Sequence, residues 1–243
     1  MKLTILGGSA AGTNTGQGCS GSLVESGNTR IVLDLGPGTL QELRKHTDYR
    51  TLNAVVISHM HLDHIGDLMA LRFTLAYNPI PPSGTIDLYL PPGGAATLNE
   101  LGKALATQPD PAGFFGSVFS ISEYDPAGEL LIDDLRLTFT PTVHFVPCWA
   151  IRLRSLTTNA GDLTFTADSG PATDLAGFAR DSEVLLAEAT YLDAPDTPLA
   201  ERGHLSAAET GEIAANANVR NLVLTHMWEE LGFENYRAGA ASA

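Results

Sequence analysis

One short segment constrains this chain more than any other. Three histidines and an aspartate fall within six residues, directly after an apolar run typical of a buried β-strand at residues 53–58. In extended backbone His59 and His61 project to the same side, because they are two residues apart. Asp63 and His64 follow where the chain turns, so they can face a second point a few ångströms away. Imidazole and carboxylate groups suit zinc and similar divalent ions, so the segment predicts a two-ion metal centre at the end of a strand.

The remaining ligands are expected at the ends of other strands. His144 ends the segment LTFTPTVH, Asp168 follows the strand-like LTFTA, and His226 ends LVLTH. Groups at the carboxyl ends of strands in an open α/β sheet converge on one rim, and the two oxygens of Asp168 can bridge two ions. A single histidine is more often an ordinary core or surface residue, but such clustering is rare without a metal. His46, in a basic stretch, is interpreted as a solvated helix residue.

The rest of the chain alternates between strand-like and helix-like runs, which predicts an α/β sandwich. No repeat, low-complexity tract or linker divides it, so residues 1–243 are expected to form a single domain. Helices are expected at residues 39–46, 68–76, 96–106 and 206–217, the last with Ser206 as N-cap. Strands are expected at residues 2–6, 21–25, 30–35, 53–58, 85–90, 135–141, 149–153, 163–167, 184–187 and 222–225.

Three glycine-rich or proline-rich segments are interpreted as irregular structure. Residues 78–84 and 108–116 are expected to leave the sheet and border a pocket, because paired prolines and glycines continue neither a helix nor a central strand. The opening GGSAAGTNTGQG lacks the spacing of a phosphate-binding loop, so it is interpreted as a flexible turn.

Charge and composition limit the kinds of molecule that the chain is expected to bind. The chain has 14 Lys and Arg against 28 Asp and Glu, a formal net charge of -14. Such a field repels polyanions, so small substrates are expected rather than long nucleic acids. No apolar run approaches the ~20 residues of a membrane helix. Neither a signal peptide nor a disulfide framework is recognisable, and Cys19 and Cys148 are interpreted as buried, so a cytoplasmic location is expected.

The histidine motif also carries a resemblance. The string His59-x-His61-x-Asp63-His64, followed by His144, Asp168 and His226, resembles the five-part signature of the metallo-β-lactamase superfamily, over nearly the whole chain. The segments Glu188-Ala189-Thr190 and Gly203-His204-Leu205-Ser206 are similar to the ribonuclease Z-like branch. Within that branch the likeness is to small bacterial phosphodiesterases that hydrolyse cyclic nucleotides. The fold that this resemblance implies is a four-layer αββα sandwich.

The resemblance also assigns roles to individual residues. Seven side chains would bind two ions, three on each and one bridging: His59, His61 and His144; Asp63, His64 and His226; and Asp168 between them. Asp63, His204 and Glu188 are the candidate catalytic residues. His204 is similar to a histidine that contacts the scissile phosphate, and it precedes an expected helix start, where an anion can bind. The alternatives are a capping histidine for His204 and a surface glutamate for Glu188, while Asp34 would orient a ligand or form a structural turn.

Two departures separate the chain from ribonuclease Z enzymes. Asp168 follows His144 by only 24 positions, too few for the tRNA-gripping arm that these enzymes typically carry there, and the chain has three lysines. Because tRNA binding depends strongly on Lys and Arg contacts with phosphates, processing of tRNA 3' ends is disfavoured.

The sequence therefore predicts a hydrolase that cleaves a phosphodiester in a small (cyclic) nucleotide through a metal-bridging hydroxide. Zinc is the expected metal, with manganese or iron as alternatives, and two cations would let an acidic protein attract an anionic substrate. Two other functions stay open: a lactone, thioester or sulfate ester hydrolase with the same centre, and a metal-binding accessory protein without turnover. The oligomeric state stays open too, with a homodimer as one alternative.

Overall fold

The computed structural model describes residues 1–106 and 111–243. In this part of the chain the strands form two six-stranded sheets. The first sheet has the order β1 (Lys2–Gly7), β2 (Gly21–Ser26), β3 (Thr29–Leu35), β4 (Ala54–Val56), β5 (Ile86–Leu90) and β6 (Phe119–Glu123). The second has the order β12 (Asn221–Thr225), β11 (Val184–Glu188), β10 (Leu163–Phe165), β9 (Trp149–Ser155), β8 (Leu135–Pro141) and β7 (Leu130–Ile132).

Both sheets are mixed. In the first, β1 to β3 are antiparallel neighbours, whereas β3 to β6 run parallel. In the second, β12, β11 and β10 run parallel, whereas β10 to β7 are antiparallel neighbours. The segment that follows β4 therefore leaves the interior of the first sheet, between β3 and β5, and the His-rich motif begins there.

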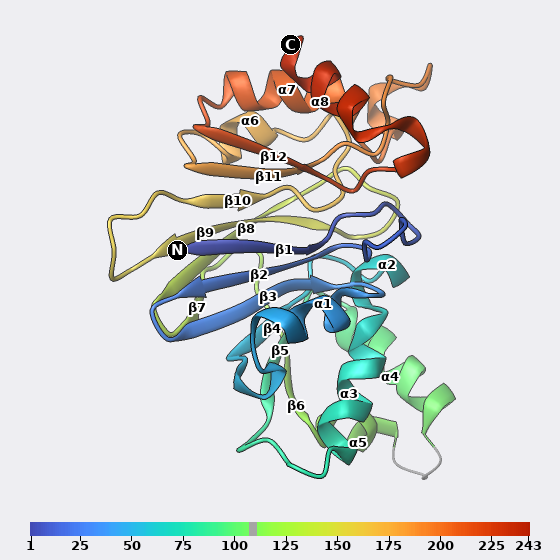
Figure 1. Cartoon of the computed structure of the whole chain (residues 1–243), viewed down its shortest axis with the longest axis vertical. Helices are drawn as coiled ribbons and strands as arrows, with labels where there is room; N and C mark the ends of the chain where they lie inside the picture. Colours follow the sequence, from blue (N-terminus) through green and yellow to red (C-terminus); the bar gives the residue numbers. More distant parts are fainter. Residues whose placement is uncertain (107–110) are drawn as a thin grey trace.

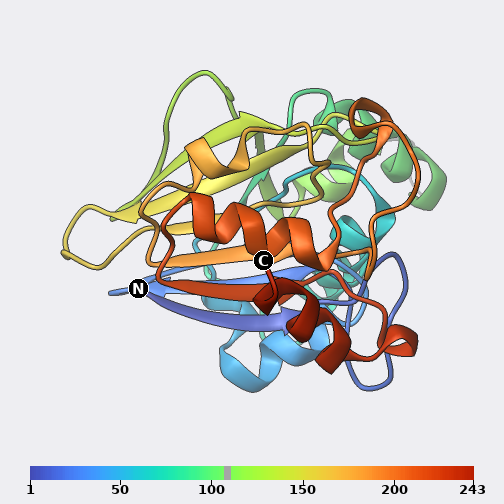
Figure 2. The same cartoon turned by 90° about the horizontal axis from the view of Figure 1, so that it is seen from above.

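Helices cover the outer face of each sheet (Figures 1 and 2). On the first sheet lie α1 (Thr39–His46), α3 (Asp67–Tyr77), α4 (Gly94–Leu105) and α5 (Pro111–Gly116). On the second lie α6 (Leu175–Phe178), α7 (Ala207–Asn216) and α8 (Phe233–Ala241). The expected four-layer αββα sandwich is confirmed.

Alternation along the inner strands explains why both faces of each sheet are apolar. In β3, Ile31 and Leu33 pack between the two sheets, while Val32 packs toward the helices. In β11, Leu186 packs between the sheets, while Leu185 packs toward α7. Strands buried on both faces read as nearly continuous apolar runs, and this is the pattern that made them recognisable.

Several expectations for the elements were incomplete. Residues 111–116 were expected to be irregular, but they form α5, because a proline is tolerated in the first turn of a helix; residues 107–110 lie outside the described part. The strands β6 and β7, the short helix α2 (Leu62–Ile65) and the terminal helix α8 were not expected. The N-cap at Ser206 is confirmed, and it forms a capping box with Glu209.

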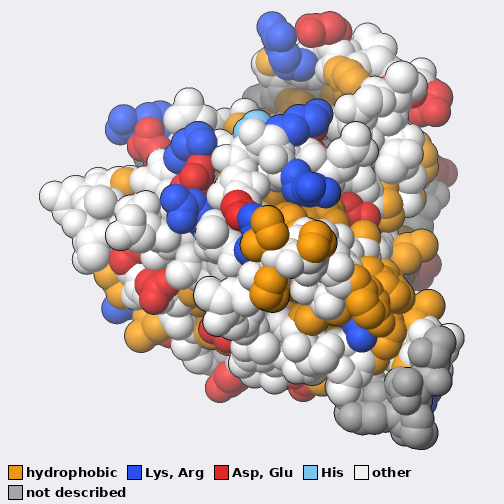
Figure 3. Space-filling model, turned by 60° about the horizontal axis from the view of Figure 1, so that its bottom comes forward, with side chains coloured by type: hydrophobic (Ala, Val, Ile, Leu, Met, Phe, Trp, Pro, Cys, Tyr) orange, Lys and Arg blue, Asp and Glu red, His pale blue; other side chains and the backbone are white. Residues whose placement is uncertain are grey.

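The surface and the cysteines add three facts. Exposed apolar side chains gather on one face of the molecule (Figure 3). Phe73 and Tyr77 on α3, and Ile80 just beyond it, have exposed side chains. Cys19 and Cys148 are buried and free, as expected. Among the described residues, no helix combines the length and apolarity needed to span a membrane.

Candidate metal centre

The first group of candidate ligands joins two histidines that follow β4 with His144, which follows β8. His59 Nε2 and His144 Nε2 each lie 3.1 Å from His61 Nδ1. Around a tetrahedral zinc ion, with Zn–N distances of about 2.0–2.1 Å, neighbouring ligand nitrogens are about 3.3 Å apart. The three nitrogens thus have the separation of ligands around one ion, and a cation among them would offset the repulsion of their lone pairs.

The second group combines α2 with the end of β12. Asp63 and His64 lie on α2, and His226 directly follows β12. His226 Nε2 is 3.1 Å from Asp63 Oδ2, and His64 Nε2 is 3.5 Å from the same oxygen. His64 Nε2 is fully buried and has no hydrogen-bond partner among the described residues. Such orphaned polar atoms are rare in folded proteins, so this nitrogen fits a metal ligand.

Asp168 lies between the two groups and is 2% exposed. Its Oδ2 is 3.6 Å from both His59 Nε2 and His144 Nε2. Its Oδ1 is 3.3 Å from His64 Nε2 and 3.5 Å from His226 Nε2. Burial alone would raise the pKa of Asp168, but the surrounding histidines hold it well below its usual range. One ionised carboxylate thus faces each group with one oxygen, the arrangement of a bridging ligand.

The second ring nitrogen of four of these histidines is also hydrogen-bonded. The partners are Ser58 Oγ for His59 (3.0 Å), Asp34 Oδ2 for His64 (2.7 Å), the Gly203 carbonyl for His144 (2.9 Å) and Thr190 Oγ1 for His226 (2.7 Å). Such contacts fix the tautomer and the orientation of a ligating imidazole. Asp34 also accepts the backbone N–H of Ser58 at 2.7 Å, so it both orients a candidate ligand and fixes the turn after β4.

Backbone conformation also contributes to the geometry of the candidate centre. Asp34, Ala167 and His226 have φ angles of 55°, 49° and 57°, in the left-handed region that costs a non-glycine residue roughly 1–3 kcal/mol. Each lies in or beside the candidate centre. Ala11, with φ of 50°, donates its N–H to Asp63 Oδ2 at 3.0 Å. The glycine-rich opening segment, expected to be only a turn, therefore contacts a candidate ligand.

His204 lies beside the candidate metal centre, and Glu188 and the ring of His226 hold its ring in place. Its Nδ1 is 3.1 Å from Glu188 Oε1 and 3.2 Å from Oε2, and its ring stacks on that of His226 with centroids 5.5 Å apart. Burial would lower the pKa of His204, but Glu188 outweighs this and raises it. The protonated form is thereby favoured, and Nε2 is the nitrogen left for another group.

Both alternative interpretations of this pair are wrong. Glu188 is 1% exposed and is no surface residue. It accepts hydrogen bonds from Ser169 N at 2.6 Å and from Thr190 Oγ1 at 2.6 Å. His204 does not cap a helix, since Ser206 is the N-cap of α7. Thr190, whose hydroxyl contacts both Glu188 and His226, was recognised only as part of a motif, without a role.

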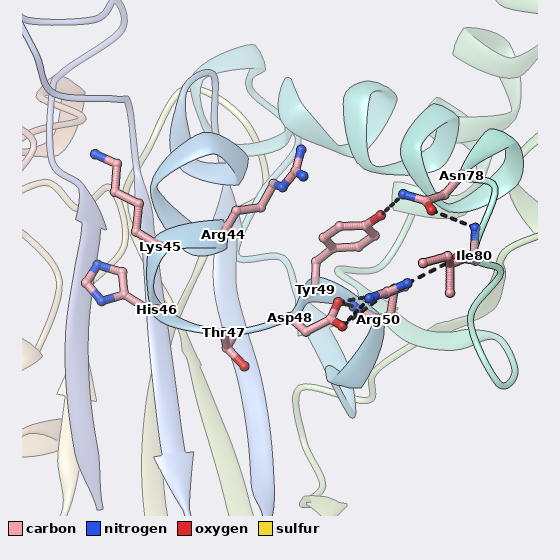
Figure 4. A pocket seen from close by; sticks show the side chains of 9 residues that line it. All are labelled: Arg44, Lys45, His46, Thr47, Asp48, Tyr49, Arg50, Asn78 and Ile80. Atoms are coloured by element: carbon pink, nitrogen blue, oxygen red, sulfur yellow. Dashed lines mark hydrogen bonds and ion pairs between the residues drawn. The ribbon is translucent and has the colours of Figure 1, made fainter.

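A separate hollow lies at the end of α1 (Figure 4). Asn78 and Ile80 help to line it, so residues 78–84 do border a pocket, but none of the candidate ligands lines this one. Its basic groups are largely paired: Arg50 with Asp48 at 2.6 Å, and His46 with Glu42 at 3.2 Å. His46 is thus a partly exposed helix residue, as expected.

The fold and this cluster match a known family. The family model described as "Beta-lactamase superfamily domain" matches residues 29–227. The chain belongs to the metallo-β-lactamase superfamily. The protein Rv1339 of Mycobacterium tuberculosis is 31% identical over 228 residues, which cover 93% of this chain and 81% of that protein.

Other relatives place the chain in the ribonuclease Z-like branch of this superfamily. The probable metallo-hydrolase YhfI of Bacillus subtilis is 29% identical over 229 residues, covering 93% of this chain and 87% of that protein. Ribonuclease Z of Bradyrhizobium diazoefficiens is 29% identical over 291 aligned positions, covering 98% of this chain and 93% of that enzyme. Because 291 positions exceed the 243 residues of this chain, the ribonuclease has residues without a counterpart here.

Solved structures show the same fold. The crystal structure of B. subtilis YhfI has a TM-score of 0.83 at 25% identity and covers 99% of this chain and 91% of that one. The short form of human tRNase Z has a TM-score of 0.75 at 20% identity, with coverage of 95% and 94%. A diphosphatase of the PhnP family has a TM-score of 0.72 at 16% identity, with coverage of 93% and 85%.

Proposed function

We propose that this metallo-hydrolase is a phosphodiesterase that uses two divalent ions, zinc first, to hydrolyse a small nucleotide phosphodiester. The observation that carries the proposal is the pair of three-ligand groups that share Asp168, with His204 beside them. When bound there, two ions would supply Lewis-acid stabilisation of a phosphoryl group and would activate water near neutral pH. The donor set of imidazoles and carboxylates fits such ions.

Residues of the chain itself would orient the ligands and donate a proton or a hydrogen bond to the substrate. The hydrogen bonds to the outer ring nitrogens keep His59, His64, His144 and His226 turned inward, so the site needs little rearrangement. His204 would act through Nε2, as a donor to a phosphoryl oxygen or to the leaving oxygen. Glu188 is a positioning residue, since it contacts Nδ1 of His204. Its negative charge also favours the protonated ring.

Three observations support a small phosphodiester as the substrate. The relatives and structural neighbours include enzymes named ribonuclease Z, tRNase Z and diphosphatase, and all three names refer to substrates that contain phosphate. The ribonuclease has residues that this chain lacks, and the net charge is -14. A polyanion would be repelled by that charge, whereas two bound cations attract a small anion locally.

The test combines metal analysis with a substrate panel. Protein saturated with zinc or manganese is expected to hold two ions per chain by elemental analysis. It should hydrolyse bis(p-nitrophenyl) phosphate, cyclic nucleotides or linear dinucleotides, and apoprotein should regain this activity when the metal is restored. A ceiling of one ion would contradict the bridging role of Asp168. Hydrolysis of a lactone or thioester without any phosphodiesterase activity would contradict the substrate class.

A further inference from the structure

An exposed aromatic side chain adjoins the centre and takes no part in metal binding. Phe145 directly follows the candidate ligand His144 and is 64% exposed. The centroid of its ring lies 5.2 Å from that of His144 and 5.7 Å from that of His204. Core packing does not account for such a residue, because most of its surface faces solvent.

The phenyl ring is nevertheless held in place by the backbone. A Cβ atom at position 203 would come within 2.9 Å of two carbons of the ring, so the ring packs closely against the backbone of Gly203. The carbonyl of the same glycine accepts the hydrogen bond from Nδ1 of His144. One residue therefore positions both the aromatic ring and a candidate metal ligand. The ring is supported on one side and open elsewhere.

We propose that Phe145 is the platform on which the base of a nucleotide substrate stacks while its phosphodiester lies at His204 and the metal centre. This inference rests on the proposed phosphodiesterase function and adds a base-binding subsite to it. A nucleotide joins its base to its phosphate through one sugar, and the ring lies beside both histidines that flank the reacting group. Stacking on an aromatic ring accepts every base, because each base has a π-face.

Charge favours this mode of recognition. The chain has 14 Lys and Arg against 28 Asp and Glu, so the overall charge does not favour binding of the rest of a nucleotide. Stacking provides affinity without added positive charge, typically about 1–3 kcal/mol per base, which is roughly 5- to 150-fold in binding. The subsite therefore predicts a preference for nucleoside phosphodiesters over equally reactive simple alkyl phosphodiesters.

The test uses two esters with the same leaving group. The p-nitrophenyl ester of thymidine 5'-monophosphate carries a base, whereas methyl p-nitrophenyl phosphate has none. Phe145→Ala is expected to lower kcat/KM for the thymidine ester about 10- to 100-fold, mainly through KM, and to leave the methyl ester within about twofold. Phe145→Trp should keep the preference, and Phe145→Leu should lose most of it. Phe73→Ala, at an exposed aromatic on α3, should change neither ester.

Three results would contradict the proposal that a base stacks on Phe145. An equal loss on both esters would mean that Phe145 only supports His144 and His204 through Gly203. An unchanged preference would mean that the base binds elsewhere. A shift of the variant from dimer to monomer in size-exclusion chromatography, with the preference retained, would mean that the ring packs against a second copy. Metal content is measured in each variant and should stay at the wild-type value.

A binding experiment separates failure of the platform from failure of the proposed function. If the metal-loaded protein hydrolyses neither ester, the phosphodiesterase proposal is wrong. Calorimetry with thymidine 5'-monophosphate and with methyl phosphate then tests the platform alone. The wild type should bind the nucleotide at least about tenfold more tightly than Phe145→Ala does, while methyl phosphate should not distinguish the two proteins. Equal affinities for the nucleotide would overturn the platform.

Discussion

At the scale of single residues, the centre depends on which of two ring nitrogens each histidine turns inward. Four candidate ligands have the outer nitrogen bonded to another group of the protein, and His204 has its Nδ1 bonded to Glu188. The same side chain can therefore serve as a ligand or as a proton donor, depending on its neighbours. Variants of His204 and of a ligand should thus fail in different ways.

The first prediction compares His204→Ala with His64→Ala. His204→Ala should keep both ions and lower kcat by roughly 10² to 10⁴, the range for losing a positioned acid or a phosphate contact. His64→Ala should lose metal, because one group keeps only part of its donors. Elemental analysis and kinetics on the same samples measure both effects. Loss of an ion from His204→Ala, or wild-type turnover of phosphodiesters, would contradict the assignment.

The second prediction concerns Thr190, whose hydroxyl contacts both Glu188 Oε2 and His226 Nδ1. Thr190→Val keeps the shape but removes both contacts, so metal affinity is expected to fall about 10- to 100-fold, as for other residues that orient ligands. Thr190→Ser keeps the hydroxyl and should stay near the wild type. Competition with a chromogenic chelator gives the affinities. Equal behaviour of the two variants would show that the hydroxyl does not orient His226.

At the scale of elements, one carboxylate joins two neighbouring strands of the second sheet, β9 and β10. Asp162, just before β10, is 7% exposed. Its Oδ2 accepts from Nε of Arg152 at 2.8 Å, and its Oδ1 accepts from Nε of Arg154 at 2.8 Å. Burial would raise the pKa of Asp162, but these arginines outweigh it and lower the pKa. The charged form is therefore favoured by folding.

The third prediction follows from that lowered pKa. A carboxyl whose pKa is lower in the folded state stabilises the fold above its unfolded pKa of about 3.9 and loses this effect as pH falls through the folded pKa. Asp162→Asn should therefore cost about 1–2 kcal/mol of unfolding free energy at pH 7, and the difference from the wild type should shrink below about pH 4. Urea unfolding of both proteins across this range measures it. A difference that stays constant with pH would contradict the role of the charge.

At the scale of the whole molecule, size and charge should select the substrate. The chain lacks residues present in the aligned ribonuclease Z and carries a net charge of -14. Long RNA would need an extended positive surface to offset its phosphates. A small nucleotide needs only the charge of the centre itself.

The fourth prediction is therefore a preference for small substrates over precursor tRNA. A cyclic nucleotide or a linear dinucleotide should be cleaved with a kcat/KM at least about a hundredfold higher, since each lost phosphate contact weakens RNA binding. Steady-state kinetics with matched metal and salt make the comparison. Efficient tRNA cleavage would show that the chain binds RNA through another surface.

The sequence by itself determined the residue types of the centre and their place along the chain. The motif at residues 59–64, with His144, Asp168 and His226 after strand-like runs, predicted the cluster that the structure assembles. It succeeded because strand patterns are local and because the end of β4, in the first sheet, lies close to the ends of β8, β10 and β12, in the second. The same local patterns predicted an α/β sandwich and most strands, and the family resemblance implied the αββα layers. The patterns missed α5, where a proline begins a helix.

Only the tertiary structure decided what holds and borders that cluster. Thr190 bonds to His226, 36 residues away, and the N–H of Ala11 bonds to Asp63, 52 residues away. No local pattern encodes such contacts, and the residue types Asp and His, although enriched among non-glycine residues with left-handed backbone, do not by themselves specify that conformation at Asp34 and His226. Glu188 was a candidate catalytic residue with a surface position as the alternative, and only the structure shows that it is buried and contacts His204. These features arise from packing between distant segments, which exists only after the sheets and helices have come together.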